Sequence, residues 1–234
     1  MGKLRVLMYH KVHQTHADFL TVKAADLQWQ LDHLSKHYTF VKLSQVLEHI
    51  QSAAPLPDNA LLVTFDDGYA DNYTLAYPAF KKRALPFAVF LVAAYIGKTT
   101  MHDGLEQTFL STQQMDNMSD LAEFAYHSLN HENLMQLDTS KWSTHIQDCK
   151  LAFNSTSLLN AWAYTYGQYP KRNKTAYALL TEVFKANQII AAFRIGNRIN
   201  QTPINDPFQI ERIDIRGNDS KLLFKLKTRF GKLI

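Results

Sequence analysis

Short apolar segments alternate along this chain with longer segments that carry apolar residues at helical spacing, and this alternation constrains the fold more than any other feature. It is typical of repeated β-α units, in which a helix follows each strand and covers the sheet. The expected strands are Leu4–Tyr9, Ala60–Phe65, Phe87–Val92, Phe124–His127, Ala161–Tyr166, Ile189–Phe193 and Ile210–Ile215. The expected helices are Ala24–His37, Leu43–Gln51, Tyr73–Arg83, Trp142–Leu159 and Lys174–Asn187.

Most of the expected strands are continuous apolar runs, which indicates burial on both faces and favours a parallel sheet. We therefore predict an α/β fold, a closed or nearly closed (β/α) barrel. Residues 1–234 are expected to form one domain, because barrels of this kind reach this length as single units and no Gly/Ser/Pro-rich linker interrupts the sequence. In such a barrel the functional residues follow the carboxyl ends of the strands.

Composition excludes few classes of protein. The formal charge of +4 is small for 234 residues, and we find no zinc-finger, RNA-binding or helix-turn-helix pattern, so nucleic-acid binding is not expected. Cys149 has no second cysteine to pair with. The apolar run Leu4–Tyr9 is too short for a signal-peptide core, and no segment has the length of a membrane-spanning helix, so a cytoplasmic protein is the simplest expectation.

Two adjacent carboxylates, Asp66 and Asp67, follow the expected strand Ala60–Phe65 directly. Near a buried strand end, at least one of them needs a cation, a metal ion or several hydrogen-bond donors. Asp-Asp-Gly is also a common surface turn, and taken alone that interpretation is favoured roughly two to one.

Two imidazoles four residues apart, His127 and His131, follow another expected strand. Two histidines and one carboxylate are a usual ligand set for a catalytic divalent ion that keeps an open position for water. Either pair alone arises often by chance, but both pairs at strand ends of one barrel favour a metal site.

Aromatic residues and a glycine lie at a third strand end, in the segment Trp162–Gly167. Their rings can stack on a sugar face and the turn can direct a backbone N–H into a pocket, although simple packing explains them equally well. At the end of the first strand, His10 is a candidate general acid or base; a structural histidine is as good an explanation.

Several of these segments resemble the polysaccharide deacetylase (NodB-like, carbohydrate esterase 4) family. Thr64-Phe65-Asp66-Asp67-Gly68 resembles its first motif and His127-Ser128-x-x-His131 its second. The resemblance extends to Met8-Tyr9-His10, to Tyr164-Thr165-Tyr166-Gly167 and to Arg212-Ile213-Asp214-Ile215, and it is strongest for members that act on poly-N-acetylglucosamine and surface polysaccharides.

The resemblance implies a distorted barrel of about seven strands and a metal-dependent N-deacetylase of an amino sugar. It implies that Asp67, His127 and His131 bind one divalent ion, with Zn²⁺ expected and Ni²⁺, Co²⁺ or Fe²⁺ as alternatives. Asp66 is then the general base for a metal-activated water, and the backbone N–H of Tyr166 helps to hold the oxyanion. Tyr164, Trp162 and Tyr126 are the expected substrate-binding residues.

The sequence departs from the family pattern in two respects. No arginine accompanies Tyr164–Gly167 to orient the base, and no late Leu-x-His motif supplies the usual general acid. His10 is our candidate for the acid, with Asp214 and a water relay as lesser ones. The segment Gly97–Thr112 is expected to be a loop, either a solvated one or a lid over the substrate.

The basic segment 220–234 has apolar residues at helical spacing. We favour a helix that closes the barrel; the alternative is peripheral contact with the inner membrane surface, near a lipid-linked sugar. Two other functions stay open: another amide hydrolase on the same fold, of the cyclic-imide or ureide type, and a catalytically silent saccharide-binding protein. The sugar, its linkage and the oligomeric state are not predicted.

Overall fold

Seven parallel strands close into a barrel. The structure is a computed structural model that describes residues 2–102, 104–153 and 158–231. Around the barrel the strands are β1 (Gly2–Tyr9), β5 (Ala60–Phe65), β6 (Phe87–Leu91), β9 (Ala122–Tyr126), β10 (Ala161–Ala163), β11 (Ala191–Ile195) and β13 (Ile210–Asp214), and β13 pairs again with β1. All seven predicted strands, the parallel sheet and the barrel are confirmed.

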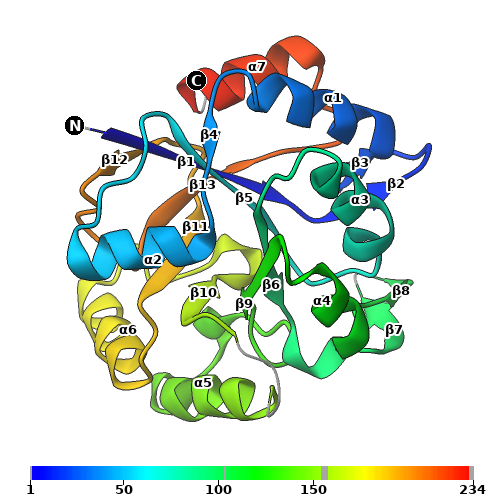
Figure 1. Ribbon diagram of the computed structural model, residues 1–234. Coiled ribbons are helices and arrows are strands. Elements are labelled where there is room, and N and C mark those ends of the chain that lie inside the picture. Colours follow the sequence, from blue (N-terminus) through cyan, green and yellow to red (C-terminus); the bar gives the residue numbers. More distant parts are fainter. Residues whose placement is uncertain (1, 103, 154–157, 232–234) are drawn as a thin grey trace.

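Helices surround this barrel (Figure 1). They are α1 (Ala24–Leu34), α2 (Leu43–Ser52), α3 (Tyr77–Lys81), α4 (Thr112–Met118), α5 (Trp142–Leu151), α6 (Lys174–Ala186) and α7 (Lys221–Phe230). The predicted helix Tyr73–Arg83 is divided into a π-helical turn, Asn72–Ala76, and α3, because Pro78 has no N–H for the helical hydrogen-bond pattern.

Two predictions about local structure are wrong. The helix predicted over Trp142–Leu159 ends at Leu151, before an Asn-Ser-Thr-Ser sequence of poor helix formers; residues 154–157 lie outside the described part. The segment Gly97–Thr112 is not an irregular loop. It contains the antiparallel strands β7 (Thr99–His102) and β8 (Leu105–Thr108), whose β-branched Thr99 and Thr108 contact each other across the pair at 3.0 Å.

Side chains alternate between two cores along each barrel strand. Inward-pointing residues fill the barrel and include Leu62, Phe90 and Phe193, with several alanines opposite the large rings. Helix α2 covers the amino-terminal end of the barrel, because its apolar residues join the same core and Ser44 donates hydrogen bonds from its N–H and Oγ to Glu123 at the start of β9. Outward-pointing residues pack under the surrounding helices.

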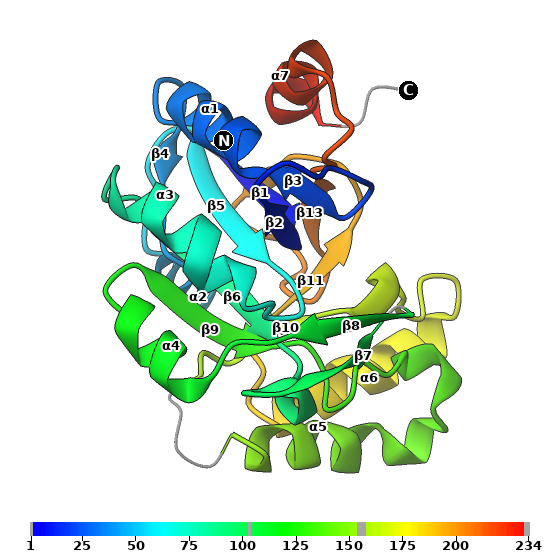
Figure 2. The ribbon, with the colours of Figure 1, turned by 90° about the vertical axis from the view of Figure 1, so that its right-hand side faces the viewer.

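The carboxyl-terminal ends of the strands form the open end of the barrel. Two small sheets lie on this side: the β7–β8 hairpin, and β2 (Lys11–His13) paired with β3 (Thr21–Lys23) (Figure 2). The short strands β4 (Thr39–Phe40) and β12 (Asn200–Thr202) extend the sheet at β5 and β1. They lie away from the open end.

Helix α7 packs beside α1 (Figures 1 and 2). Phe224 of α7 contacts Trp29 of α1, with ring centroids 5.6 Å apart, and Phe224 and Thr228 are buried. The predicted helix over 220–234 is therefore present at Lys221–Phe230, and residues 232–234 lie outside the described part. Among the described residues, no helix is both long and apolar enough to cross a bilayer.

Candidate active site

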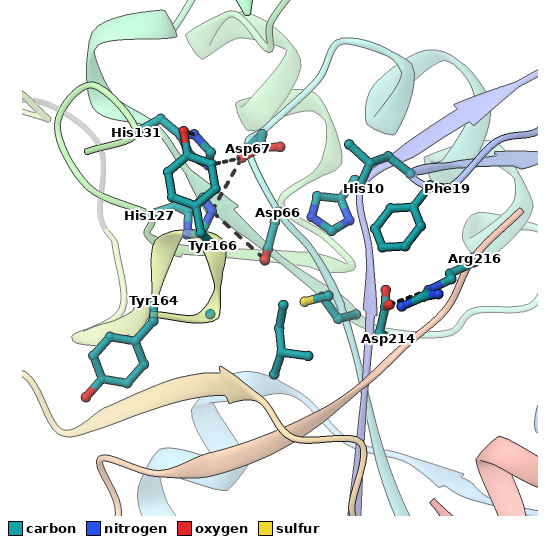
Figure 3. Close-up of a pocket in the computed structure, with 14 residues that line it drawn as sticks. His10, Phe19, Asp66, Asp67, His127, His131, Tyr164, Tyr166, Asp214 and Arg216 are labelled. Atoms are coloured by element: carbon teal, nitrogen blue, oxygen red, sulfur yellow. Dashed lines mark hydrogen bonds and ion pairs between the residues drawn. The ribbon is translucent and has the colours of Figure 1, made fainter. Parts of the chain in front are cut away.

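A cavity of about 330 Å³ opens at the carboxyl ends of the barrel strands. Figure 3 shows the side chains around it. The cavity is lined by these members of the predicted site: His10, Asp66, Asp67, His127, His131, Tyr164, Tyr166 and Asp214. The chain therefore brings the metal ligands, the base and the acid candidates of the sequence analysis to one place.

Asp66 and Asp67 both face this cavity, although adjacent residues of an extended strand point to opposite sides. The reason is the backbone after β5. Asp67 has φ +70° and Gly68 has φ +81°, so the chain turns sharply at the strand end. The positive φ of Gly68 favours glycine, and an added Cβ would also lie only 2.6 Å from a methyl carbon of Leu91, which would have to shift.

His127 and His131 present their Nε2 atoms to Asp67. The Nδ1 of His127 donates to the carbonyl oxygen of Ala163 at 2.9 Å, which leaves Nε2 unprotonated in the neutral ring. The Nδ1 of His131 contacts the hydroxyl of Tyr166 at 3.1 Å. Such contacts at the second ring nitrogen are the usual way in which proteins orient histidine ligands of metals.

Asp67, His127 and His131 fit a divalent ion. Asp67 Oδ1 lies 3.4 Å from His127 Nε2 and 3.2 Å from His131 Nε2. Ligand atoms bound to zinc at tetrahedral angles lie roughly 3.4 Å apart, so the spacing suits the ion. Moreover, Asp67 Oδ1 is buried and accepts no hydrogen bond of good geometry from the described residues.

Asp66 is held by a residue that the sequence analysis did not connect to it. From β13, the guanidinium of Arg212 forms two hydrogen bonds to the carboxylate, Nη1 to Oδ1 at 2.6 Å and Nη2 to Oδ2 at 2.8 Å. Burial alone would raise the pKa of Asp66, but the charge and hydrogen bonds of Arg212, together with the nearby His127 and His10, outweigh burial and hold the pKa below its usual value. The arginine that is missing near Tyr164–Gly167 thus has a counterpart on another strand.

A third imidazole lies against the other oxygen of Asp67. His102, at the end of β7, is buried, and its Nε2 lies 3.8 Å from Asp67 Oδ2. Its ring also contacts that of His131, with centroids 4.7 Å apart. Burial raises the pKa of Asp67, yet His102, His127 and His131 together hold that pKa well below its usual value. His102 belongs to the segment Gly97–Thr112, which we expected to be a solvated loop or a lid; the structure places its side chain against Asp67, a metal-ligand candidate.

His10 lies on the opposite side of the cavity from His127 (Figure 3). Its carbonyl oxygen accepts a hydrogen bond from Asn72 Nδ2 at 3.0 Å, and Asp71 Oδ1 accepts from the N–H of Val12 at 3.0 Å. Two side chains of the turn after β5 therefore fix the backbone around His10. Asp214, the lesser acid candidate, is paired with Arg216 at 2.7 Å.

Four residues of the site have left-handed backbones that side chains other than glycine rarely adopt. They are Asp67, Ser128, His131 and Tyr166, with φ between +54° and +73°. Such residues cost of order 1–3 kcal/mol each and cluster at functional sites, where the surrounding structure enforces them. Their concentration here supports the assignment of this cavity as the functional site.

The structure places the three predicted substrate-binding aromatics differently from our expectation. Trp162 is 0% exposed and packs against Phe184 of α6, and Tyr126 packs with Trp162 in the outer core. Both point outward from the barrel, because they have the opposite strand parity to His127 and Ala163, so they cannot contact a substrate in the cavity. Tyr164 borders the cavity, but its hydroxyl donates to the carbonyl oxygen of Phe208 and the side chain is buried.

Fold and site together define a β/α-barrel protein with an Asp-His-His group that could hold a metal ion, beside a second, arginine-bound aspartate. The chain belongs to the polysaccharide deacetylase family, whose sequence model matches residues 53–182, more than half of the 234 residues. It is 26% identical over 189 residues to a Bacillus subtilis protein described as a polysaccharide deacetylase, YxkH. The match covers 76% of this chain and 63% of that relative, so this chain spans less than two thirds of its length.

A shorter stretch is similar to an Escherichia coli (strain K12) poly-beta-1,6-N-acetyl-D-glucosamine N-deacetylase, with 35% identity over 75 residues, which is 31% of this chain and 11% of that protein. Among solved structures, IcaB from Ammonifex degensii has a TM-score of 0.79 at 21% identity and covers 98% of this chain and 97% of its own. The Streptococcus pyogenes deacetylase PplD, in complex with acetate, has a TM-score of 0.76 at 23% identity, with 97% and 98% covered. These similarities confirm the fold.

Proposed function

We propose that this protein hydrolyses the N-acetyl group of an N-acetylated amino sugar within a saccharide, and that it requires one divalent ion. The observation that carries the proposal is the position of two carboxylates with separate partners in one cavity. Asp67 faces the two histidines, and Asp66, held by Arg212, lies 4.0 Å from His127 Nε2. One carboxylate can therefore bind a metal while the other stays free to accept a proton.

Asp67, His127 and His131 would hold the ion. Two imidazoles and a carboxylate suit Zn²⁺ best, and Ni²⁺, Co²⁺ and Fe²⁺ also accept this set. A bound ion of this kind acts as a Lewis acid and lowers the pKa of water, which hydrolysis of a poorly reactive amide needs.

Asp66 is the proposed general base. Arg212 keeps it ionised and fixes the plane of its carboxylate, so that an oxygen is available for the proton of the attacking water. Since Arg212 is 0% exposed and comes from a barrel strand, this orientation is rigid.

His10 is the proposed general acid, which gives a proton to the departing amine nitrogen. His10 lines the cavity. Hydrogen bonds from Asn72 to the carbonyl of His10, and from the N–H of Val12 to Asp71, hold the backbone at this position. The backbone N–H of Tyr166 is the proposed oxyanion donor, in a turn whose left-handed residue borders the cavity. Together these groups would move one proton from water to the amine and release acetate.

The substrate class rests on the family and on the named activity of the E. coli relative, poly-beta-1,6-N-acetyl-D-glucosamine deacetylation. A polymer, an oligosaccharide and a lipid-linked sugar from surface-polysaccharide synthesis all carry the same acetamide. In the alternative function, an amide hydrolase of the cyclic-imide or ureide type, the same metal ligands and the same base would act on a different substrate. The silent binding protein is disfavoured by the intact ligand set and base.

The bound-metal content of the purified protein tests the proposal first. We expect close to one divalent ion per chain after reconstitution, and almost none in Asp67→Ala. The metal-loaded protein should then release acetate from N-acetylglucosamine oligomers, whereas Asp66→Asn should hold metal and release none. A native protein that retains no ion would refute metal dependence and favour the binding protein.

Residues 1–234 are proposed to act as one catalytic domain, because strands from both ends of the described chain complete the barrel. The cytoplasmic location and the membrane contact through residues 220–234 remain proposals. Leu222 and Phe230 are the exposed apolar residues of α7, next to Lys221, Lys225 and Arg229. Replacing Leu222 and Phe230 by aspartate tests the contact without removing α7 from α1; unchanged co-sedimentation with anionic liposomes would exclude it.

A further inference from the structure

A second cavity, of about 350 Å³, adjoins the proposed active site on the side of α7. It lies where the chain leaves β13 and turns toward α7, and Asp214 and Arg216 line both cavities. Apart from Leu223, every described residue that lines the second cavity has a polar or charged side chain. A sugar in the first cavity therefore has a polar compartment directly beside it.

The charge that the second cavity presents to a ligand is positive, although two carboxylates line it. Lys227 Nζ donates to both oxygens of Asp219, at 2.8 and 2.6 Å, and the N–H of Arg216 donates to the same carboxylate at 3.0 Å. The side chains of Asp219 and Asp214 are 3% and 6% exposed, whereas that of Arg216 is 40% exposed. Because the two acids are paired and covered, the guanidinium dominates the electrostatic potential at the surface of the cavity.

Arg216 is held in place by contacts that use few of its hydrogen-bond donors. Its Nε donates to Asp214 Oδ2 at 2.7 Å, and its guanidinium carbon lies 4.1 Å from the centroid of the Phe19 ring. Figure 3 shows these three side chains together. Nη1 and Nη2, which carry four N–H groups, have no hydrogen-bonding partner among the residues that the structure describes. The guanidinium is therefore oriented in advance, and its outer edge is available to a ligand.

These features suit a phosphate group. Arginine binds two oxygens of a phosphate through parallel N–H groups, and a guanidinium that is already fixed loses little freedom in doing so. Asn197 lines the same cavity and accepts a hydrogen bond from the N–H of Asp214 at 2.9 Å through Oδ1, while its Nδ2 has no partner within the described chain. A phosphate directs its oxygens to several sides, so it can accept from Arg216 and from Asn197 at once.

We propose that the second cavity binds a phosphate group carried by the sugar that is deacetylated, with Arg216 as its main hydrogen-bond donor. This inference rests on the proposed function, because it places an N-acetylated sugar in the first cavity. It narrows the substrate class to sugar phosphates, either free or joined through the phosphate to a lipid.

The test compares the affinity of N-acetylglucosamine with the affinities of its 1-phosphate and 6-phosphate. Metal-loaded Asp66→Asn is titrated calorimetrically, so that no ligand is consumed, and each further change is made in this variant. Arg216→Gln removes the proposed donor. Asn218→Asp places a negative charge at an exposed position that lines the second cavity and not the first. Gln201→Glu is the matched control, because it makes the same change in charge on an exposed residue of β12, away from the open end.

We expect at least one sugar phosphate to bind about tenfold more tightly than the neutral sugar, a difference of roughly 1.4 kcal/mol. This ratio of affinities should fall to near one in Arg216→Gln and in Asn218→Asp, and it should be unchanged in Gln201→Glu. A ratio near one before these changes would overturn the subsite. A tenfold ratio that survives Arg216→Gln would also overturn it, because the phosphate would then bind elsewhere, for example at the metal ion. Equal loss of the ratio in Gln201→Glu would show a general effect of charge and would overturn it as well.

Two phosphodiesters of N-acetylglucosamine, with a methyl or a dodecyl group on the phosphate, distinguish the two sources of this chemistry. α7 begins at Lys221, beside the second cavity, and its Leu222 is exposed. Tighter binding of the dodecyl ester that Leu222→Asp reduces would identify a lipid-linked sugar. Equal or weaker binding of the dodecyl ester would identify a free sugar phosphate. Both results support the phosphate subsite, provided that the ratio of affinities depends on Arg216.

Acetate release by the unmodified protein separates this inference from the proposed function. Release that is equally efficient for neutral and phosphorylated sugars would leave the deacetylase standing and remove the subsite. Tighter binding of a sugar phosphate that depends on Arg216, without acetate release from any of these sugars, would support the subsite and refute the deacetylase.

Discussion

The guanidinium of Arg212 binds both oxygens of the Asp66 carboxylate, although 146 residues separate the two positions in the sequence. Both side chains are buried, so neither ion could be placed here alone. The ion pair links the end of β5 to β13, the two strands that lie on either side of β1 in the barrel. It also sets the protonation state of the residue on which the proposed chemistry depends.

Replacing Arg212 by lysine should therefore change catalysis more than metal binding. A lysine keeps the charge but cannot bind both oxygens, so we expect kcat to fall roughly 10- to 100-fold with KM little changed. Weaker compensation of the buried carboxylate raises the pKa of Asp66, and the acid limb of kcat against pH should move to higher pH. Arg194→Lys is the control, because Arg194 pairs with Glu211 and does not line the cavity. An unshifted acid limb would contradict the role.

His102→Phe should weaken metal retention. His102 faces Asp67 Oδ2, and loss of such a supporting contact typically lowers metal affinity by about 10- to 100-fold. Phenylalanine preserves the aromatic contacts with Tyr95 and Phe109 but removes the ring nitrogens. Competition with a zinc chelator measures the affinity. The control is His37→Phe, in the turn that follows α1. Equal zinc affinities of the unmodified protein and the two variants would exclude a supporting role of His102.

His10→Gln should affect only those substrates whose leaving group needs a proton. With an N-acetylated sugar, loss of a general acid should lower kcat by roughly 10²- to 10⁴-fold. An aryl acetate releases a stable phenolate, so its hydrolysis should be nearly unchanged in this variant. Asp66→Asn should lose both activities. If His10→Gln slows both substrates equally, the proton comes from another group.

Asp71 should make the stability of the protein depend on pH. Burial raises its pKa from 3.8 to about 7. Between these values the folded protein keeps a proton that the unfolded chain has lost, so the free energy of unfolding should fall as pH rises through this range, by roughly 4 kcal/mol in all. Asp71→Asn keeps Oδ1 as acceptor for Val12 and should lack this component. Denaturant unfolding at pH 4.5 and pH 8 measures the free energy of unfolding of both proteins. The same change between the two pH values in the unmodified protein and in Asp71→Asn would refute the role of Asp71.

The sequence was sufficient for the barrel because its strands are continuous apolar runs separated by amphipathic helices. The sequence also predicted that Asp66, Asp67, His127 and His131 lie close together, because these residues follow strands and parallel strands end at the same face of the barrel. The pattern Ile210, Arg212, Asp214 contains a further signal. Alternate residues of a barrel strand share the interior, and a charged side chain there requires a partner of opposite charge.

Other features could not be predicted in the same way. The inward or outward direction of Trp162 and Tyr126 depends on strand register, which their apolar segments do not reveal. His102 reaches Asp67 only because the β7–β8 hairpin folds back on the open end of the barrel, a contact between elements that no local pattern encodes.

The filled interior of the barrel has a kinetic consequence. Below the site, Phe90 and Phe193 occupy the lumen, and α2 covers the far end, so the described residues leave no second exit. In the proposed reaction, acetate would then depart through the opening by which the saccharide arrives. While the saccharide product still occupied this opening, the small anion would have to diffuse past it. Release of acetate would thereby be coupled to movement of the saccharide product, and added acetate should slow turnover by occupying the vacated position before the next saccharide binds.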